Sequence, residues 1–82
     1  MVKAQIEKIL QEKFQPTFLE VIDDSAKHAG HAGASQGGHY NVIIVSAAFE
    51  GKKLIDRHRL IYQAVEPIKA KIHALAIQTK TP

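Results

Sequence analysis

Four contiguous branched residues, Val42 to Val45, constrain the fold of this 82-residue chain more than any other feature. A strand with one face in water usually alternates apolar and polar residues, whereas a strand covered on both faces can be apolar throughout. The segment from Tyr40 to Ser46 therefore predicts a strand buried on both faces. We expect this strand to lie at the centre of a sheet.

The segments before this run predict a helix followed by a strand. Apolar residues recur at the spacing of one helical face from Val2 to Phe14, with lysine and glutamate between them, and Pro16 closes the helix. Phe18 to Asp23 is short, alternating and rich in branched and aromatic residues, which is typical of a strand. The apolar face predicted for the helix consists of Ile6, Ile9, Leu10 and Phe14.

The segments after the run predict two helices and a third strand, in the overall order helix, strand, strand, helix, helix, strand. Pro67 marks the first turn of a short helix that is expected to reach about Ala70. Ile72 to Gln78 is almost continuously apolar and predicts a strand. Before these, a helix is expected from Lys53 onward, with an apolar stripe formed by Leu54, His58, Ile61, Tyr62 and Val65.

The segment from Ser25 to His39 is expected to be a flexible loop between the first two strands. It has almost no large apolar residue and contains four of the five glycines of the chain, so it cannot pack into a core. Loops of this length in a compact domain are usually functional or mobile. The loop is therefore the first place to search for a binding role.

Length and composition predict one domain, residues 1–82, in a reducing compartment. Eighty-two residues allow a single modest core, and the absence of cysteine removes any disulfide framework, which favours the cytoplasm. Charged residues interrupt Met1 to Lys13, so we expect neither a signal peptide nor association with a membrane. The net charge of +3 permits weak attraction to nucleic acid or acidic partners but is too small to indicate either.

Five histidines without a cysteine limit the possible metal chemistry to imidazole ligands. His28 and His31 have a spacing that suits one metal ion, but a structural zinc site needs four nitrogen or sulfur ligands. The alternative is that both are ordinary polar residues of a solvated loop. His39, at the foot of the second predicted strand, is interpreted as a bystander.

The other two histidines have different predicted environments. His58 falls inside the apolar stripe of its helix, which favours a buried structural histidine bonded to a backbone carbonyl or a carboxylate. His73 alternates with Leu75 and Ile77, so it is either half-buried in the core or, at a strand end, turned toward a partner. The chain has no nucleophile elbow, phosphate loop or acidic motif, so we expect it not to be an enzyme.

Several short segments, in their order and spacing, resemble the BolA family, and the histidine loop is similar to its BolA1-like branch. The resemblance covers essentially the whole chain. The segments are Val45-Ser46, Phe49-Glu50-Gly51-Lys52, Arg57-His58-Arg59-Leu60, Ile72-His73-Ala74-Leu75-Ala76 and Thr79-Lys80-Thr81-Pro82, with His28-Ala29-Gly30-His31 after Val21-Ile22-Asp23-Asp24-Ser25.

The resemblance implies an α+β, class II KH-like fold, α-β-β-α-α-β, with a three-stranded mixed sheet packed on helices. It also implies a partner of a monothiol glutaredoxin that shares a bridging 2Fe-2S cluster, for cluster assembly and trafficking or iron regulation. The glutaredoxin cysteine and glutathione then supply sulfur, and this chain supplies nitrogen from His73 and from His28, with His31 as the alternative loop ligand. No cofactor is expected in the isolated chain, which is expected to be a monomer or a weak dimer.

The same family is also described as DNA-binding transcription regulators. For this chain the resemblance implies contacts from the second helix and the turn before it. Contacts of lysine and arginine with phosphate are sensitive to salt. The matching basic residues are Lys52, Lys53, Arg57 and Arg59.

Overall fold

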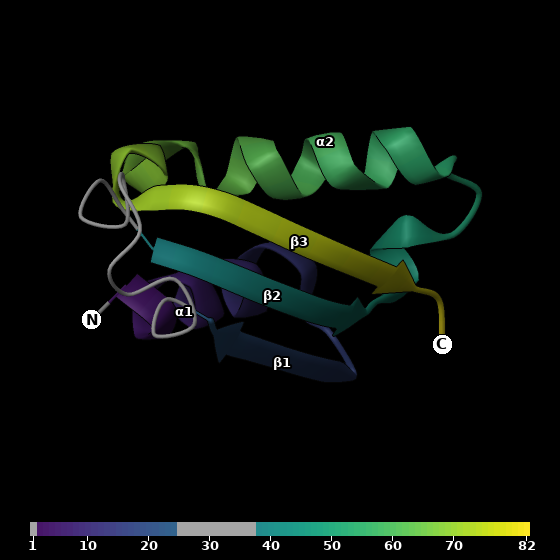
Figure 1. The fold of residues 1–82 in the computed structure, drawn as a ribbon. Helices are drawn as coiled ribbons and strands as arrows, with labels where there is room; N and C mark the ends of the chain where they lie inside the picture. Colours follow the sequence, from purple (N-terminus) through teal and green to yellow (C-terminus); the bar gives the residue numbers. More distant parts are fainter. Residues whose placement is uncertain (1, 25–37) are drawn as a thin grey trace.

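The computed structural model describes residues 2–24 and 38–82, which form an α+β fold (Figure 1). The predicted order of helices and strands is confirmed, with one additional short 3-10 helix after the central strand. The elements are α1 (Val2–Phe14), β1 (Phe18–Asp23), β2 (Gly38–Val45), η3 (Ala47–Phe49), α2 (Leu54–Ala64), η4 (Glu66–Lys71) and β3 (Ile72–Lys80).

The three strands form one mixed sheet with β2 at its centre, as predicted. β1 pairs antiparallel with β2, and β2 pairs parallel with β3. Two parallel strands need a crossover connection, which α2 and η4 supply here. β2 and β3 therefore both begin at the same end of the sheet, and α2, which lies alongside the sheet, carries the chain back to that end (Figure 1).

Only one face of β2 is fully buried, so the prediction of burial on both faces is wrong. Tyr40, Val42 and Ile44 are buried, whereas the residues between them are only partly covered. The reason is that α1 and α2 contribute their buried side chains to the same core, on one side of the sheet. We call the other side the open face; it presents Phe18, Glu20, Ile22, Asn41 and Ile43.

The helix α1 packs as its sequence predicts. Ile6 and Leu10 are fully buried, and Ile9 and Phe14 pack against the core from its edge. At the end of the helix, the Phe14 ring lies 5.3 Å from the ring of Phe49, centre to centre. Burying an aromatic side chain of this size removes a large apolar area from water, so this contact joins α1 to η3.

The buried side of α2 differs from the predicted stripe. Ile61 and Val65 are buried as expected, together with Ala64, but Leu54 is 61% exposed and Tyr62 is 52% exposed. Tyr62 lies about 100° round the helix from Ile61, because an α-helix has 3.6 residues per turn. Its hydroxyl donates a hydrogen bond to the carbonyl oxygen of Leu75, 3.3 Å away. The ring therefore lies over the edge of the sheet instead of entering the core.

Both strands that flank the crossover are longer than predicted. β2 begins at Gly38, so the last two residues of the predicted loop belong to the strand, and β3 continues to Lys80. The amide of Ser46 donates to the carbonyl oxygen of Lys80 at 3.0 Å, which extends the pairing of β2 with β3. The remainder of the predicted loop lies outside the described residues. None of the described helices has the length and apolar character to cross a membrane.

Candidate functional site

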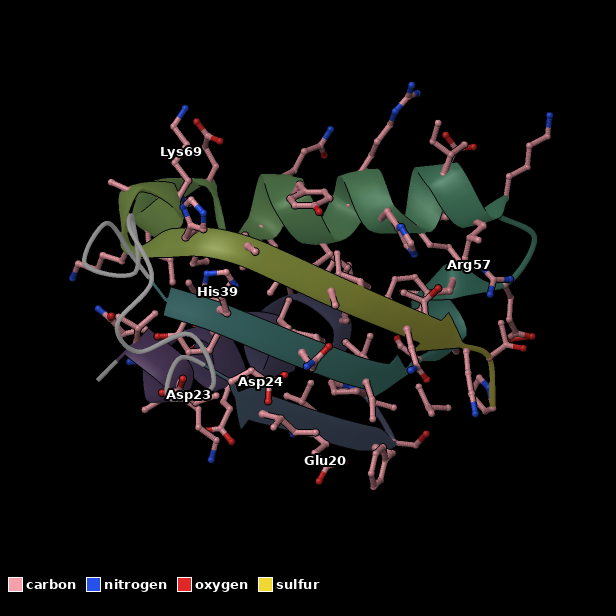
Figure 2. All side chains as sticks on the ribbon, in the orientation of Figure 1. Glu20, Asp23, Asp24, His39, Arg57 and Lys69 are labelled. Atoms are coloured by element: carbon pink, nitrogen blue, oxygen red, sulfur yellow. The ribbon has the colours of Figure 1, made fainter. Side chains whose placement is uncertain are left out.

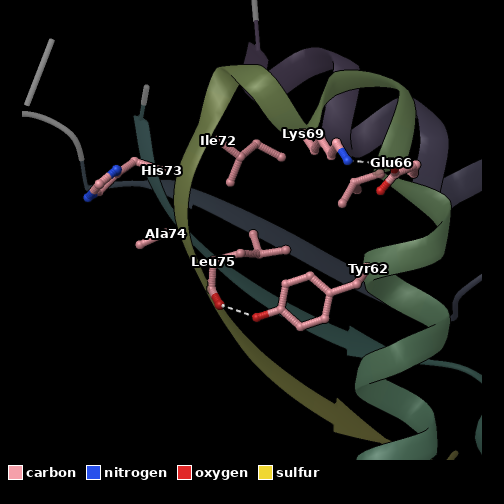
Figure 3. Close-up of a pocket in the computed structure, with 8 residues that line it drawn as sticks. Tyr62, Glu66, Lys69, Ile72, His73, Ala74 and Leu75 are labelled. Carbon is pink, nitrogen blue, oxygen red and sulfur yellow. Dashed lines mark hydrogen bonds and ion pairs between the residues drawn. The ribbon is translucent and has the colours of Figure 1, made fainter. Parts of the chain in front are cut away.

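His73 is aimed at the open face by an irregularity in β3. Along β2, Gly38 pairs with Ile72 and the next residue, His39, pairs with Ala74, so His73 is one extra residue in β3. Such a bulge disturbs the alternation of a strand and can re-aim a side chain. His73 is accordingly exposed and lies on the opposite side of β3 from Leu75 (Figure 3). The half-buried core position that simple alternation suggests for His73 is therefore wrong.

His39 lies directly beside His73. The two imidazole ring centres are 4.9 Å apart and their planes are inclined by 45°. Figure 2 shows His39 at the beginning of β2. The sequence predicts no role for His39, whereas in the structure its ring contacts that of His73, the histidine that the resemblance singles out.

The backbone around His39 is held from both sides. On one side, the carbonyl oxygen of His39 accepts a hydrogen bond from the amide of Asp24 at 2.7 Å, which continues the β1–β2 pairing. On the other side, His39 pairs with β3. The Asn41 side chain also donates a hydrogen bond to the Asp24 carboxylate. A β-carbon at Gly38, just before His39, would lie 2.5 Å from the Tyr40 ring, so a larger residue there would have to displace that ring. The backbone of His39 is therefore fixed by its neighbours on both sides in the sheet.

The histidine pair offers nitrogen ligands alone. In the described part of the chain, no group of three or more histidine, cysteine or acidic residues could hold a metal ion. Two imidazoles occupy at most two positions of a tetrahedral metal, so a complete site needs further ligands from outside the described residues. His28 and His31, the predicted loop ligands, lie outside the described residues.

His58 takes the structural position that its helix predicts but not the predicted hydrogen bond. The residue is partly buried on α2. Among the described residues, its Nε2 atom is buried without a hydrogen-bond partner. A buried nitrogen of this kind usually has a partner. His58 does not join the histidine pair, because no three histidine, cysteine or acidic residues of the described ranges lie close enough together to hold one metal ion.

A groove of about 440 Å³ runs between the end of α2, η4 and the first residues of β3 (Figure 3). The Tyr62 hydroxyl lies on its wall, and Lys69 pairs with Glu66 at 2.9 Å. The Glu66 carboxylate accepts a hydrogen bond from the Lys69 ammonium and attracts its charge, which raises the pKa of Lys69. The groove is lined by Tyr62, Val65, Glu66, Lys69, Ile72, His73, Ala74 and Leu75.

Three of the four predicted basic residues lie on one surface, and Arg57 does not. Lys52, Lys53 and Arg59 line a shallow depression at the beginning of α2, where Arg59 pairs loosely with Asp56 at 3.8 Å. Arg57 instead turns back, and its Nε donates to the carbonyl oxygen of Lys52 at 2.9 Å. We call Lys52, Lys53 and Arg59 the basic surface. It lies where α2 begins, at the opposite end of the sheet from the histidine pair (Figure 1).

Comparisons with known proteins give one consistent family. The family model described as BolA-like protein matches residues 10–82. The DNA-binding transcriptional regulator BolA of Escherichia coli is 42% identical over 82 residues, which cover 99% of this chain and 76% of that protein. BolA-like protein 1 of Mus musculus is also 42% identical over 82 residues, with 99% of this chain and 58% of that protein covered.

A solved structure supports the same assignment. The BolA domain of SufE1 from Arabidopsis thaliana is 45% identical and superimposes with a TM-score of 0.85, covering 99% of this chain and 92% of that chain. The predicted helix and strand order therefore matches an experimentally determined domain. The chain spans only part of the mouse relative, so the full length of that relative includes segments with no counterpart in these 82 residues. These relatives are named as regulators or BolA-like proteins.

Proposed function

The chain belongs to the BolA family, and on this premise we propose that it is a non-enzymatic partner of a monothiol glutaredoxin. In this proposal the two proteins share a bridging 2Fe-2S cluster, with sulfur ligands from the glutaredoxin cysteine and from glutathione. The role served is cluster assembly and trafficking or iron regulation.

The observation that carries the proposal is the position of His73. The bulge in β3 places this imidazole on the open face, exposed and next to a second imidazole. A ligand for a cluster shared between two proteins must be accessible to the partner, and His73 meets this condition. His58, which is partly buried with an enclosed Nε2, does not.

The composition of the chain fits the same role. It has no cysteine, so it cannot supply thiolate, and a partner must complete the ligand set. Histidine ligation of one iron raises the reduction potential of a 2Fe-2S cluster, as in Rieske centres. His73 is the proposed principal ligand, and His28 or, alternatively, His31 is the proposed loop ligand.

The proposal is tested by assembling the cluster from purified components. The chain and a monothiol glutaredoxin are mixed anaerobically with iron, sulfide and glutathione, and visible circular dichroism follows the mixed complex. We expect His73→Ala to lose the spectrum of the mixed complex and to leave only that of the glutaredoxin. The matched control is His58→Ala, which also removes one imidazole but from a site away from the open face.

Two further variants separate the loop ligands. If His28 is the loop ligand, His28→Ala changes the spectrum and His31→Ala does not, and the reverse holds for His31. A spectrum of the mixed complex that is identical in the wild type and His73→Ala contradicts the proposal.

A second candidate function is DNA binding at the basic surface, and a specific relative favours it. The Escherichia coli protein that is 42% identical to this chain is named a DNA-binding transcriptional regulator. Lys53 and Arg59 are both exposed on the basic surface, next to the first turn of α2. This position suits contacts with phosphate groups.

The DNA proposal predicts a change in salt dependence. Each lost phosphate contact on duplex DNA lowers the slope of log affinity against log salt by about 0.9. For Lys53→Ala combined with Arg59→Ala, we expect a slope smaller by about 2 and weaker binding at low salt. His73→Ala serves as the control and should bind as the wild type does. An unchanged slope in the double variant excludes the basic surface as the DNA contact.

A further inference from the structure

We propose that His39 and His73 form a two-imidazole site that binds one divalent cation of borderline softness, such as Zn²⁺, in the isolated chain. The proposal goes beyond the shared cluster, because it requires neither glutaredoxin nor iron. It assigns a role to His39, which lies in β2 and not in the loop that the resemblance points to.

The separation of the two rings matches the geometry of a shared metal ion. A histidine nitrogen binds Zn²⁺ at about 2.1 Å, so the ring centre lies roughly 3.2 Å from the ion. Two rings at the tetrahedral angle then have centres about 5 Å apart. The observed separation between His39 and His73 is 4.9 Å.

The backbone holds both histidines in place before any ion binds. His39 pairs with β1 through Asp24 on one side and with β3 on the other. His73 occupies the bulge in β3, at the same end of the sheet. Little backbone ordering is therefore needed on binding, and the second imidazole binds intramolecularly once the first has bound.

The donor set determines which ions fit. Neutral imidazole suits zinc, copper and nickel, whereas magnesium and calcium prefer oxygen ligands. Within residues 2–24 and 38–82 no third histidine, cysteine or acidic residue joins the pair, so these residues leave at least two positions of a tetrahedral ion to other ligands such as water. The site is thus open, and we expect exchangeable binding instead of the closed coordination of a structural zinc site.

The test uses the full chain without glutaredoxin and ZnCl₂ as the probe. Isothermal titration measures the affinity of the wild type, His39→Ala, His73→Ala and the matched control His58→Ala, which also removes one imidazole. We expect one zinc ion per chain in the wild type and a loss of roughly tenfold or more in either single variant of the pair, because each loses the intramolecular second ligand. The control should bind within about twofold of the wild type.

A second measurement avoids substitution altogether, in case a variant is poorly folded. Nitrogen-15 spectra of the histidine side chains in the wild type should show zinc-induced shifts at His39 and His73 and none at His58. The proposal is overturned if the wild type binds no zinc, if His39→Ala binds as tightly as the wild type, or if zinc shifts the side-chain nitrogens of His58 instead of those of His39 and His73. None of these outcomes affects the glutaredoxin proposal, whose test depends on His73 in the mixed complex.

Discussion

The two ends of the sheet carry different chemistry and are specified in different ways. At the end where β2 and β3 begin, two imidazoles meet although they are 34 positions apart in the sequence, at His39 and His73. At the end where α2 begins, the basic surface comes mainly from neighbours in the sequence, Lys52 and Lys53, with Arg59 further along the helix. A metal-binding role and a phosphate-binding role can therefore coexist in one small domain without sharing a residue.

The difference shows which features a sequence pattern can predict. Neighbouring basic residues are visible in the sequence, although the return of Arg57 to the Lys52 carbonyl is not. The contact of His39 with His73 depends on the register of two parallel strands and on a one-residue bulge. Both are properties of the assembled sheet.

The core lies between the two ends of the sheet. A substitution there should lower the stability of the whole domain and so affect both ends. Phe49 is fully buried and its ring contacts Phe14. We expect Phe49→Ala to lower the free energy of unfolding by about 3–5 kcal/mol, which is a large part of the total for a small domain. Urea denaturation measures this loss.

Phe18→Ala is the matched control, because Phe18 is 50% exposed on the open face. The same truncation there should cost far less, about 1 kcal/mol or below. Equal losses in the two variants would contradict the assignment of Phe49 to the core and of Phe18 to the open face.

A smaller loss of stability is expected for a substitution at the junction between α1 and η3. This junction lies at the end of the sheet that carries the basic surface. Ser46 is buried, its hydroxyl donates to the carbonyl oxygen of Phe14 at 2.7 Å, and it accepts from the amide of Ala48 at 3.1 Å. Ser46→Ala leaves both partners without this hydrogen bond, so we expect a loss of about 1–3 kcal/mol in the free energy of unfolding.

The control for this junction is Thr17→Ala, which removes an exposed hydroxyl at 3.4 Å from the carbonyl oxygen of Val45. It should change stability by no more than about 0.5 kcal/mol. Zinc binding at the other end should survive both substitutions. A selective loss of zinc binding in Ser46→Ala would show that the two ends are coupled.

The smallest effect on stability is expected from the ion pair of Lys69 with Glu66, in the groove beside the histidine pair. The Glu66 carboxylate raises the pKa of Lys69 above its ordinary value of 10.5. The ion pair of Lys69 with Glu66 therefore stabilises the fold at pH values below 10.5. This stabilisation is lost as the pH rises through the pKa of Lys69 in the folded state. Glu66→Gln should lower the pKa of Lys69 toward 10.5 and remove this alkaline dependence, which nuclear magnetic resonance titration of Lys69 can follow. An unchanged pKa would contradict the pairing.

Most of the fold was predictable from the sequence, because its elements follow local patterns. The bounds of α1 and β1 agree with the spacing of their apolar residues and with Pro16. The burial of β2 on one face only was not predictable in this way, because it depends on both helices packing on the same side. A continuous apolar run fits either arrangement.

The candidate site was predictable only in part. The pattern places His73 at the beginning of a strand, but alternation assigns it to the face of Leu75, and the bulge reverses that assignment. The signal for His39 was present in the expected order of elements. A strand, a helical crossover and a parallel neighbouring strand bring the beginnings of both strands to one end of the sheet, which places His39 near His73.

The most direct test of the central claim is pulsed electron paramagnetic resonance of the reduced mixed complex with glutaredoxin. The histidines of this chain alone are labelled with nitrogen-15, so any coupling of that isotope to the cluster must come from them. We predict strong nitrogen-15 coupling in the wild type, loss of the His73 contribution in His73→Ala, and no change when Lys53 and Arg59 are replaced by alanine. A cluster without coupling to a histidine nitrogen of this chain would contradict the account.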